Sequence, residues 1–277
     1  MYRLCIAALL IEALMFGYVF FVHSLHLRVA FLDVGQGDAI LMSTPFGQRI
    51  LIDGGPDNSL LARVGRNLPL YERTIDLVIL THPQSDHFGG LIELLRRYTV
   101  SRVMITGAVN DTAAYREFLD TALQKRVQFI KADHPAKIFL GKNLWLALLY
   151  PKADMSAELV KDLNETSIFA KLSYGEIDFL FTGDASARTE DLLLADDIRA
   201  EVLKISHHGS KFSTSQKFLQ SVAPNYAVIQ SGANNRFGHP SPQTLERLLG
   251  VHAKVLRNDE RGDIVMRSDG RKISVKK

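Results

Sequence analysis

The residues that could do chemistry gather first in the segment 80–90, LTHPQSDHFGG, which ends the apolar run DLVIL. Two imidazoles and a carboxylate, those of His82, Asp86 and His87, fall within six residues of one another. Imidazole and carboxylate together are the usual ligands of zinc and manganese in hydrolytic sites. The segment therefore predicts part of a metal site at the end of a buried strand.

Four further strand ends carry polar residues of the same kinds. They are Asp53 in LIDGG, Asp184 in FLFTGD, the pair His207 and His208 in KISHHGS, and His239 in FGHPS. Each alone has a structural explanation: a solvated loop for an isolated His, a helix cap for Asp184, and a turn for Asp53. Because strand ends hold functional groups rigidly, the presence of such residues at several strand ends favours one shared site.

The elements that must position these residues alternate between short β-branched runs and amphipathic segments. Strands are expected at 27–34, 39–44, 48–55, 75–82, 102–107, 127–132, 144–151, 167–185 (with a turn at 174–176), 200–210, 225–235 and 253–258. Helices are expected at 58–67, 88–98, 112–125, 215–222 and 242–249, with one more starting near Asp184 or Ser186. This order predicts an α/β fold of two mixed sheets with helices outside.

Composition excludes some classes of site. The chain has 277 residues, 47% hydrophobic and 23% charged, with a formal net charge of +3. That charge permits an anionic substrate but is too small to identify a nucleic-acid-binding protein. Cys5 is the single cysteine, so neither an internal disulfide nor a cysteine-rich zinc site can form. Any metal must be held by His, Asp and similar side chains.

The N-terminus departs from the globular pattern. Residues 4–22 form a 19-residue apolar run interrupted only by Glu12, and as a helix they would span roughly 28 Å, close to a bilayer core. A signal peptide is the alternative, but no small-x-small cleavage site follows. We therefore expect residues 1–25 to be a membrane anchor or uncleaved signal and residues 26–277 to be one domain. Arg3 favours a cytoplasmic N-terminus, which would place that domain on the extracytoplasmic side.

Six motifs occur in the order found in the metallo-β-lactamase superfamily. They are DVGQGD (33–38), LIDGG (51–55), THPQSDHFGG (81–90), FTGDA (181–185), HHGS (207–210) and NNRFGHPS (234–241). Over residues 27–270 the sequence resembles more closely the soluble hydrolase-like domain of the ComEC competence proteins, which take up DNA across membranes. The resemblance implies a four-layer αββα sandwich with a metal site between the sheet edges.

The resemblance also implies roles for individual residues. His82 corresponds to the first His of the HxHxDH motif, Asp86 and His87 to its final pair, Asp184 to the carboxylate that bridges two metals, and His239 to the last His ligand. His207 and His208 resemble the extra His that phosphodiesterases place over the substrate phosphate or leaving group. The alternative is that His207 is the last ligand and His239 lies outside the site.

Two positions depart from the motif. Gln84 replaces the second His of HxHxDH, and Asn164 stands where another His ligand is expected. Both belong to one half of a binuclear site. We therefore expect one or two divalent ions, zinc or manganese, with one held firmly and the other weakly.

Further residues are expected around the metal. Asp38 and Asp53 are expected to orient ligand imidazoles. Asn235 and Arg236 are expected to grip phosphate, although a solvated loop explains them equally well.

The predicted function is metal-dependent hydrolysis of a phosphodiester, in the first place single-stranded DNA. Asp86 would orient or deprotonate the attacking water, and His207 or His208, as an imidazolium, would stabilise developing charge or protonate the leaving group. A different phosphoester or ester, such as a nucleotide or a cell-envelope component, is a second possibility. A third is a non-catalytic module that binds DNA or a partner at the membrane.

The expected partners follow from the same resemblance. They are DNA, the membrane through residues 4–22, and a separate channel protein, because a complete ComEC protein carries a channel with many spans. The oligomeric state is left open.

Overall fold

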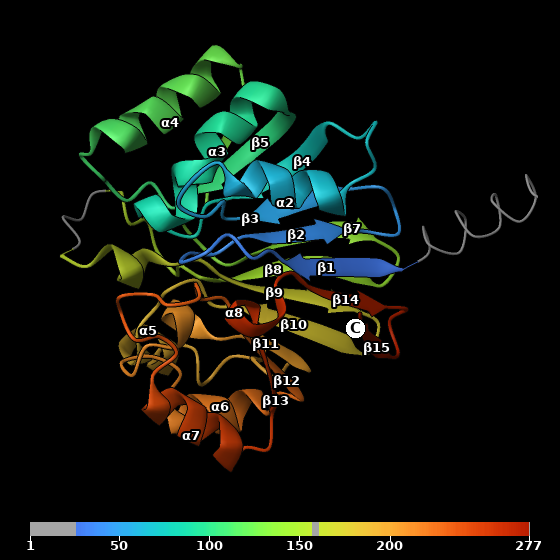
Figure 1. Cartoon of the computed structure of the whole chain (residues 1–277), viewed down its shortest axis with the longest axis vertical. Helices are drawn as coiled ribbons and strands as arrows, with labels where there is room; N and C mark the ends of the chain where they lie inside the picture. Colours follow the sequence, from blue (N-terminus) through green and yellow to red (C-terminus); the bar gives the residue numbers. More distant parts are fainter. Residues whose placement is uncertain (1–25, 157–160, 277) are drawn as a thin grey trace, which may run out of the picture.

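Two β-sheets pack face to face, and helices cover their outer faces, as Figure 1 shows. The computed structural model of the chain describes residues 26–156 and 161–276. The layers run helix, sheet, sheet, helix, so the expected four-layer α/β sandwich is confirmed.

The prediction of a single-pass membrane protein is corrected by the structure. Across residues 26–156 and 161–276, no helix combines the length and the apolar composition needed to cross a bilayer. The predicted anchor at residues 1–25, with its apolar run at 4–22, lies outside the described residues.

The first sheet has eight strands in the order β15-β14-β1-β2-β3-β4-β5-β6. They are β1 (Leu27–Phe31), β2 (Ile40–Ser43), β3 (Arg49–Ile52), β4 (Thr74–Ile79), β5 (Thr99–Ile105), β6 (Gln128–Lys131), β14 (Ile264–Ser268) and β15 (Ile273–Val275). The run from β15 to β3 is antiparallel, and β3 to β6 are parallel.

The second sheet has seven strands in the order β13-β12-β11-β10-β9-β8-β7. They are β7 (Ala136–Gly141), β8 (Leu144–Tyr150), β9 (Phe169–Tyr174), β10 (Ile177–Phe181), β11 (Val202–Lys204), β12 (Tyr226–Ile229) and β13 (Lys254–Arg257). Here β7 to β10 are antiparallel and β10 to β13 are parallel. Parallel neighbours end at the same edge of their sheet, which is where loops collect functional groups.

The helices divide between the two outer faces. The first sheet is covered by α2 (Ser59–Asn67), α3 (Ser85–Arg97) and α4 (Ala113–Gln124), and the second by α5 (Ala187–Asp191), α6 (Gln216–Val222) and α7 (Pro242–Gly250). The short helix α8 (Asn258–Arg261) and the 3₁₀ turns η1 (Leu163–Thr166) and η2 (Ser206–Gly209) complete the described elements.

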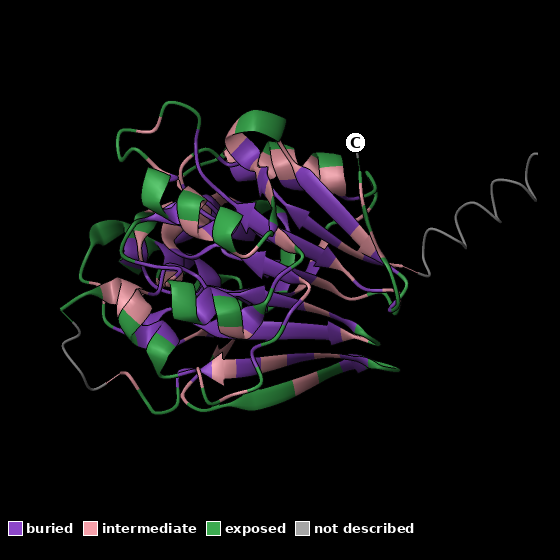
Figure 2. Cartoon of the chain, turned by 90° about the horizontal axis from the view of Figure 1, so that it is seen from below, coloured by how far each residue is buried: buried purple, intermediate pink, exposed green. Residues whose placement is uncertain are grey.

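The core lies between the sheets and beneath the helices. Phe31 on β1 and Phe181 on β10 meet across the two sheets, with ring centres 6.3 Å apart. Phe88 of α3 and Phe118 of α4 pack together on the buried sides of these helices, with ring centres 6.0 Å apart. Figure 2 shows the buried residues concentrated on the strands and the exposed ones on the outer sides of the helices.

The structure differs from the predicted elements in one helix start and in three strands, and it decides between two predicted helix caps. Helix α3 begins at Ser85 rather than near residue 88, so Asp86 and His87 lie in its first turn. A carboxylate is favourable there, because the amino end of a helix carries partial positive charge. Of the two caps predicted for α5, Ser186 is confirmed, since its hydroxyl accepts from the Arg188 amide at 3.2 Å. The strands β7, β14 and β15 were not predicted.

Two glycines inside helices give a prediction about stability. A Cβ at Gly89 of α3 would lie 2.0 Å from the Pro56 carbonyl oxygen, whereas one at Gly65 of α2 would meet nothing within 4 Å. Gly89→Ala should therefore destabilise the chain by about 1–3 kcal/mol through overpacking. Gly65→Ala should stabilise it by about 0.5–1 kcal/mol, because alanine favours a helix. Urea unfolding measures both, and equal effects of the two changes would contradict this packing of α3.

Candidate metal centre

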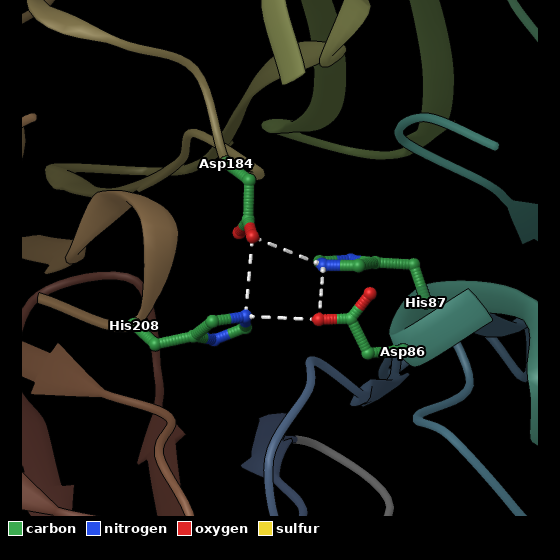
Figure 3. A group of neighbouring side chains, drawn as sticks. All are labelled: Asp86, His87, Asp184 and His208. Atoms are coloured by element: carbon green, nitrogen blue, oxygen red, sulfur yellow. Dashed lines mark ion pairs between the residues drawn. The ribbon is translucent and has the colours of Figure 1, made fainter. Parts of the chain in front are cut away.

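Four side chains from distant parts of the sequence point to a common centre. Asp86, His87, Asp184 and His208 each place one ligand atom within 4.8 Å of the others, as Figure 3 shows. Asp184 Oδ2 lies 3.2 Å from His87 Nε2 and 3.1 Å from His208 Nε2. His208 Nε2 lies 3.5 Å from Asp86 Oδ2. Two imidazoles and two carboxylates thus share one space.

The ends of parallel strands carry these residues. Asp86 and His87 follow β4 and begin α3, Asp184 follows β10, and His208 follows β11. The first pair comes from the first sheet and the second from the other, so the cluster lies where the two sheets meet. The fold thus brings together residues that only the folded sandwich makes neighbours.

The backbone of η2 turns His208 toward the centre. His207 and His208 both have left-handed conformations, with φ values of 50° and 53°, which cost non-glycine residues free energy and often mark functional sites. His208 Nδ1 donates to the Gln230 carbonyl oxygen at 2.9 Å and also lies 3.4 Å from Asp38 Oδ1. Because Nδ1 carries this proton, Nε2 is the nitrogen available as a ligand.

His87 is oriented by Asp53 in the same manner. Its Nδ1 lies 2.8 Å from Asp53 Oδ2. That carboxylate is itself fixed by Thr81, whose amide donates to Oδ1 at 2.7 Å. The predicted role of Asp53, holding a ligand imidazole by its far nitrogen, agrees with this arrangement.

His82 is buried beside His87, with ring centres 4.1 Å apart. Its Nδ1 lies 3.0 Å from Thr81 Oγ1, and that hydroxyl donates its proton to Asp53 Oδ2 at 2.7 Å. Thr81 therefore accepts from His82 Nδ1, which leaves His82 Nε2 free. His82 does not belong to the four-residue cluster.

The unpartnered atoms of the site test whether a cation fits. The buried atoms that make no hydrogen bond in the described part of the chain include the Nε2 atoms of His82, His87 and His208, and Asp184 Oδ2. Leaving a buried polar atom unsatisfied costs about 1–3 kcal/mol. Imidazole nitrogens and a carboxylate oxygen are the donors that zinc and manganese accept. The residues present therefore fit a divalent metal ion.

The charges of the cluster depend on one another. Burial alone would lower the pKa of His87, but Asp184 and Asp53 outweigh it and raise that pKa well above its usual value. Asp184 likewise raises the pKa of His208 against the effect of burial, with help from Asp38 and Asp86. Burial opposes ionisation of Asp184, yet His208, His87 and Lys204 hold the pKa of Asp184 well below its usual value. Both imidazoles therefore carry protons near neutral pH when no cation replaces them.

The four-residue cluster contains His208, whereas His239 lies beside it. The His239 ring centre lies 5.7 Å from that of His207 and 6.4 Å from that of His208. Burial, with the neighbouring His208 and His207, lowers the pKa of His239 to about 4. The difference arises because the left-handed turn of η2 points His208 inward, which the sequence does not reveal. A ligand role for His239 stays a prediction.

His207 lies at the margin of the centre. Its Nε2 is 4.0 Å from Asp184 Oδ2, and its side chain is partly exposed. Burial lowers the pKa of His207, and the positive charges of His208 and Lys204 lower it further. The ring is therefore neutral near pH 7, so of the two rings expected from the sequence as an imidazolium, His207 and His208, the surrounding charges favour His208.

The other predicted residues line the approach to the centre. A cavity of about 580 Å³ opens over it, bordered by Gln84, Asp86, His207, Asn235, Arg236 and His239 among others. Asn235 is engaged in its own loop, accepting from the His239 amide at 3.0 Å and donating to the Gly232 carbonyl at 2.9 Å. The Arg236 guanidinium lies 5.0 Å from the centre of the Phe237 ring. Asn164 lies in η1, and its buried Oδ1 has no hydrogen-bond partner among the described residues.

Three residues of the site carry little sequence signal. Lys204 is buried and forms ion pairs with Asp38 and Asp184. Ser167 accepts from the Asp184 amide at 3.0 Å and lies 3.4 Å from His82 Nδ1. Thr81, described above, is the third. The one available signal is that Lys204 interrupts an otherwise apolar strand three residues before the His pair.

Comparison with known families agrees with this fold. Residues 32–232 match the family described as the Metallo-beta-lactamase superfamily, and the chain belongs to it. The resemblance found in the sequence is thereby confirmed.

Within that superfamily, the chain is similar to competence and recombination proteins. It is 30% identical over 263 residues to the ComE operon protein 3 of Bacillus subtilis (strain 168), covering 88% of this chain and 33% of that protein. It is 29% identical over 227 residues to Recombination protein 2 of Haemophilus influenzae, covering 80% of this chain and 26% of that protein. The chain thus spans a third or less of the length of these relatives.

A solved structure shows the same fold. The metallo-beta-lactamase fold protein YhfI from Bacillus subtilis superposes with a TM-score of 0.58 at 12% identity, covering 87% of this chain and 100% of that one. At this identity the likeness concerns the fold alone.

The protonated imidazoles predict how metal binding depends on pH. A cation can bind the Nε2 atoms of His87 and His208 only after they lose their protons. Affinity for Mn²⁺ or Zn²⁺ should therefore rise between about pH 6 and 8, by about tenfold per pH unit for each displaced proton. Isothermal titration calorimetry in buffers of different ionisation enthalpy measures the number of protons released when the metal binds. An affinity that does not change with pH would contradict the assignment.

The contact between Asp53 and His87 predicts a loss of affinity. Asp53→Asn keeps the shape of the side chain but removes the anionic acceptor behind His87. Metal affinity should fall about 10–100-fold, the usual effect of losing such a supporting group. Asp76→Asn is the matched control, because Asp76 also accepts a backbone N–H, that of Arg49 at 2.7 Å, outside the metal centre. If both variants bind metal as tightly as the wild type, Asp53 does not support the site.

Proposed function

We propose that the chain is a metal-dependent phosphodiesterase that acts on DNA. The observation that carries the proposal is the convergence of four ligand atoms, from Asp86, His87, Asp184 and His208, beneath an open cavity. Superfamily membership supports a hydrolytic use of this site. Fold alone does not decide the substrate, because one scaffold hosts many hydrolases.

Asp86, His87, Asp184 and His208 would hold the ion, with His82 and His239 as further candidate ligands. When bound, a divalent ion supplies a water whose pKa falls from about 15.7 toward about 7, and a charge that polarises a phosphoryl oxygen. Zinc and manganese both suit these donors.

The chain's own residues have separable tasks around the reacting phosphate. Asp86 faces the cavity, and although burial opposes it, His208 and His87 lower the pKa of Asp86, so its carboxylate is ionised and can orient a water or accept its proton. His207 is neutral near pH 7 and borders the same cavity, so it can hydrogen-bond the phosphate or take up a proton. Arg236 borders the cavity with a permanent charge suited to phosphate.

DNA is favoured as the substrate by the relatives. The name of Recombination protein 2 refers to recombination, a process in which DNA is the molecule handled. We propose single-stranded DNA in particular. A separate channel protein is the partner that we propose from the resemblance of the sequence to the ComEC proteins.

A binding function without catalysis is the second candidate. It is favoured by the amides of Gln84 and Asn164, which occupy positions where the superfamily pattern has imidazoles. Such a module would bind DNA in the same cavity but would leave it intact.

The activity test uses the full chain with labelled single-stranded DNA, duplex DNA, a simple phosphodiester and a simple ester. Cleavage should require Mn²⁺ or Zn²⁺ and stop with a chelator. Asp184→Asn removes the charge that faces both His87 and His208, so we expect cleavage to fall at least about 100-fold, as when a central charged group of an active site is lost.

Asp178→Asn is the control for this variant, because Asp178 is paired with Lys171 on the neighbouring strand outside the centre. It should cleave as the wild type does. Cleavage of the ester alone would show that DNA is not the substrate. DNA binding without cleavage would favour the non-catalytic module. If the Asp184→Asn variant cleaves as fast as the wild type, the assignment of this cluster as the active site is wrong.

A further inference from the structure

Lys204 places a positive charge inside the metal centre. It ends β11, and its side chain is only 1% exposed. Its ammonium is paired with Asp38 Oδ2, donates to the Gly183 carbonyl oxygen at 2.8 Å, and lies 3.4 Å from Asp184 Oδ1. An ammonium has three N–H donors, and here each has an acceptor.

These contacts divide the carboxylate of Asp184 between two kinds of partner. Oδ1 faces Lys204, while Oδ2 faces His87 and His208 and makes no hydrogen bond. A carboxylate that serves two metal ions through its two oxygens needs both of them free. In this chain only Oδ2 is free.

Asp38 is held by the same ammonium. It lies within 4.8 Å of Asp53 and His87, so these three also form a group capable of holding a cation. Its Oδ2 pairs with Lys204, however, while its Oδ1, which lies 3.4 Å from His208 Nδ1, makes no hydrogen bond. The charge that this group could offer to a second ion is therefore neutralised by a side chain.

The ligands left for a second ion are poor. His82 offers one unpartnered nitrogen. Gln84 and Asn164 offer only neutral amide oxygens, which bind divalent ions more weakly than carboxylates and imidazoles do. Among the described residues, each carboxylate of that half of the site already has a charged partner: Lys204 pairs with Asp38 and Asp184, and His87 pairs with Asp53.

We propose that Lys204 takes the role of the second cation, so that the centre holds one divalent ion per chain. The inference rests on the proposed function only in that the centre binds metal. Lys204 is a positioning residue: it fixes Asp184 and Asp38 and balances their charge, and it does not touch the substrate.

The test counts bound metal in the full-length chain. After loading with Mn²⁺ or Zn²⁺ and dialysis, elemental analysis should give about one ion for the wild type. Lys204→Met removes the ammonium, frees Asp184 Oδ1 and Asp38 Oδ2, and should raise the count toward two. In the Mn²⁺ form, electron paramagnetic resonance should change from the signal of an isolated ion to that of a coupled pair.

Lys171→Met is the matched control. Lys171 on β9 is also largely buried and also joins two carboxylates, Asp178 Oδ2 at 3.1 Å and Asp197 Oδ2 at 3.0 Å, but it lies outside the centre. It should still bind one ion and keep the isolated-ion signal. This control separates the loss of a buried lysine from the loss of this lysine.

Removing one partner of a buried pair can prevent folding. The double variant Lys204→Met with Asp38→Asn avoids an unpaired buried charge, still frees Asp184 Oδ1, and should also bind a second ion. Two tightly held ions in the wild type would overturn the inference whatever the variants do. A folded Lys204→Met variant that still binds only one ion would also overturn the inference. A wild type that binds no ion would contradict the proposed function itself.

Discussion

Asp184 carries a negative charge where almost no water can reach it, and the structure around it is arranged to balance that charge. An isolated buried carboxylate costs far more free energy than a protein domain can offset. His87, His208 and Lys204 meet this requirement from three directions, and each is held in turn by another acid or carbonyl. The strand ends that carry these groups must therefore meet, which fixes how the two sheets align.

The sandwich supplies that alignment through apolar packing. Contacts such as that between Phe31 and Phe181 hold the sheets together along their length, and each fully buried phenylalanine contributes roughly 1.5–3 kcal/mol. The polar cluster can then be confined to one edge, where the parallel strands of both sheets end. The core provides most of the free energy of folding. This free energy offsets the cost of holding charged groups close together at the edge of the sheets.

The sequence predicted the parts of this arrangement that depend on local pattern. Apolar runs ending in Asp53, Asp86, His87 and Asp184 located the strand ends, and the motifs identified the superfamily. The choice between His208 and His239 depends on two consecutive left-handed residues, which no periodicity reveals.

Lys204 escaped prediction for a related reason. A lysine in a strand is usually exposed, and only the fold shows which carboxylates surround this one. The strand β7 lies at a sheet edge and the strands β14 and β15 close the other sheet, so tertiary pairing decides them more than local sequence does.

The centre draws its members from both halves of the chain, Asp86 and His87 from the first sheet and Asp184 and His208 from the second. A cation bound there would link the two sheets, because each sheet supplies two of its ligands. Neither half offers the complete ligand set, so an unfolded or half-assembled chain would compete poorly for the ion. The ion would then bind tightly only after the two layers have packed together. Metal binding would thus complete both the folding of the chain and the formation of its active site.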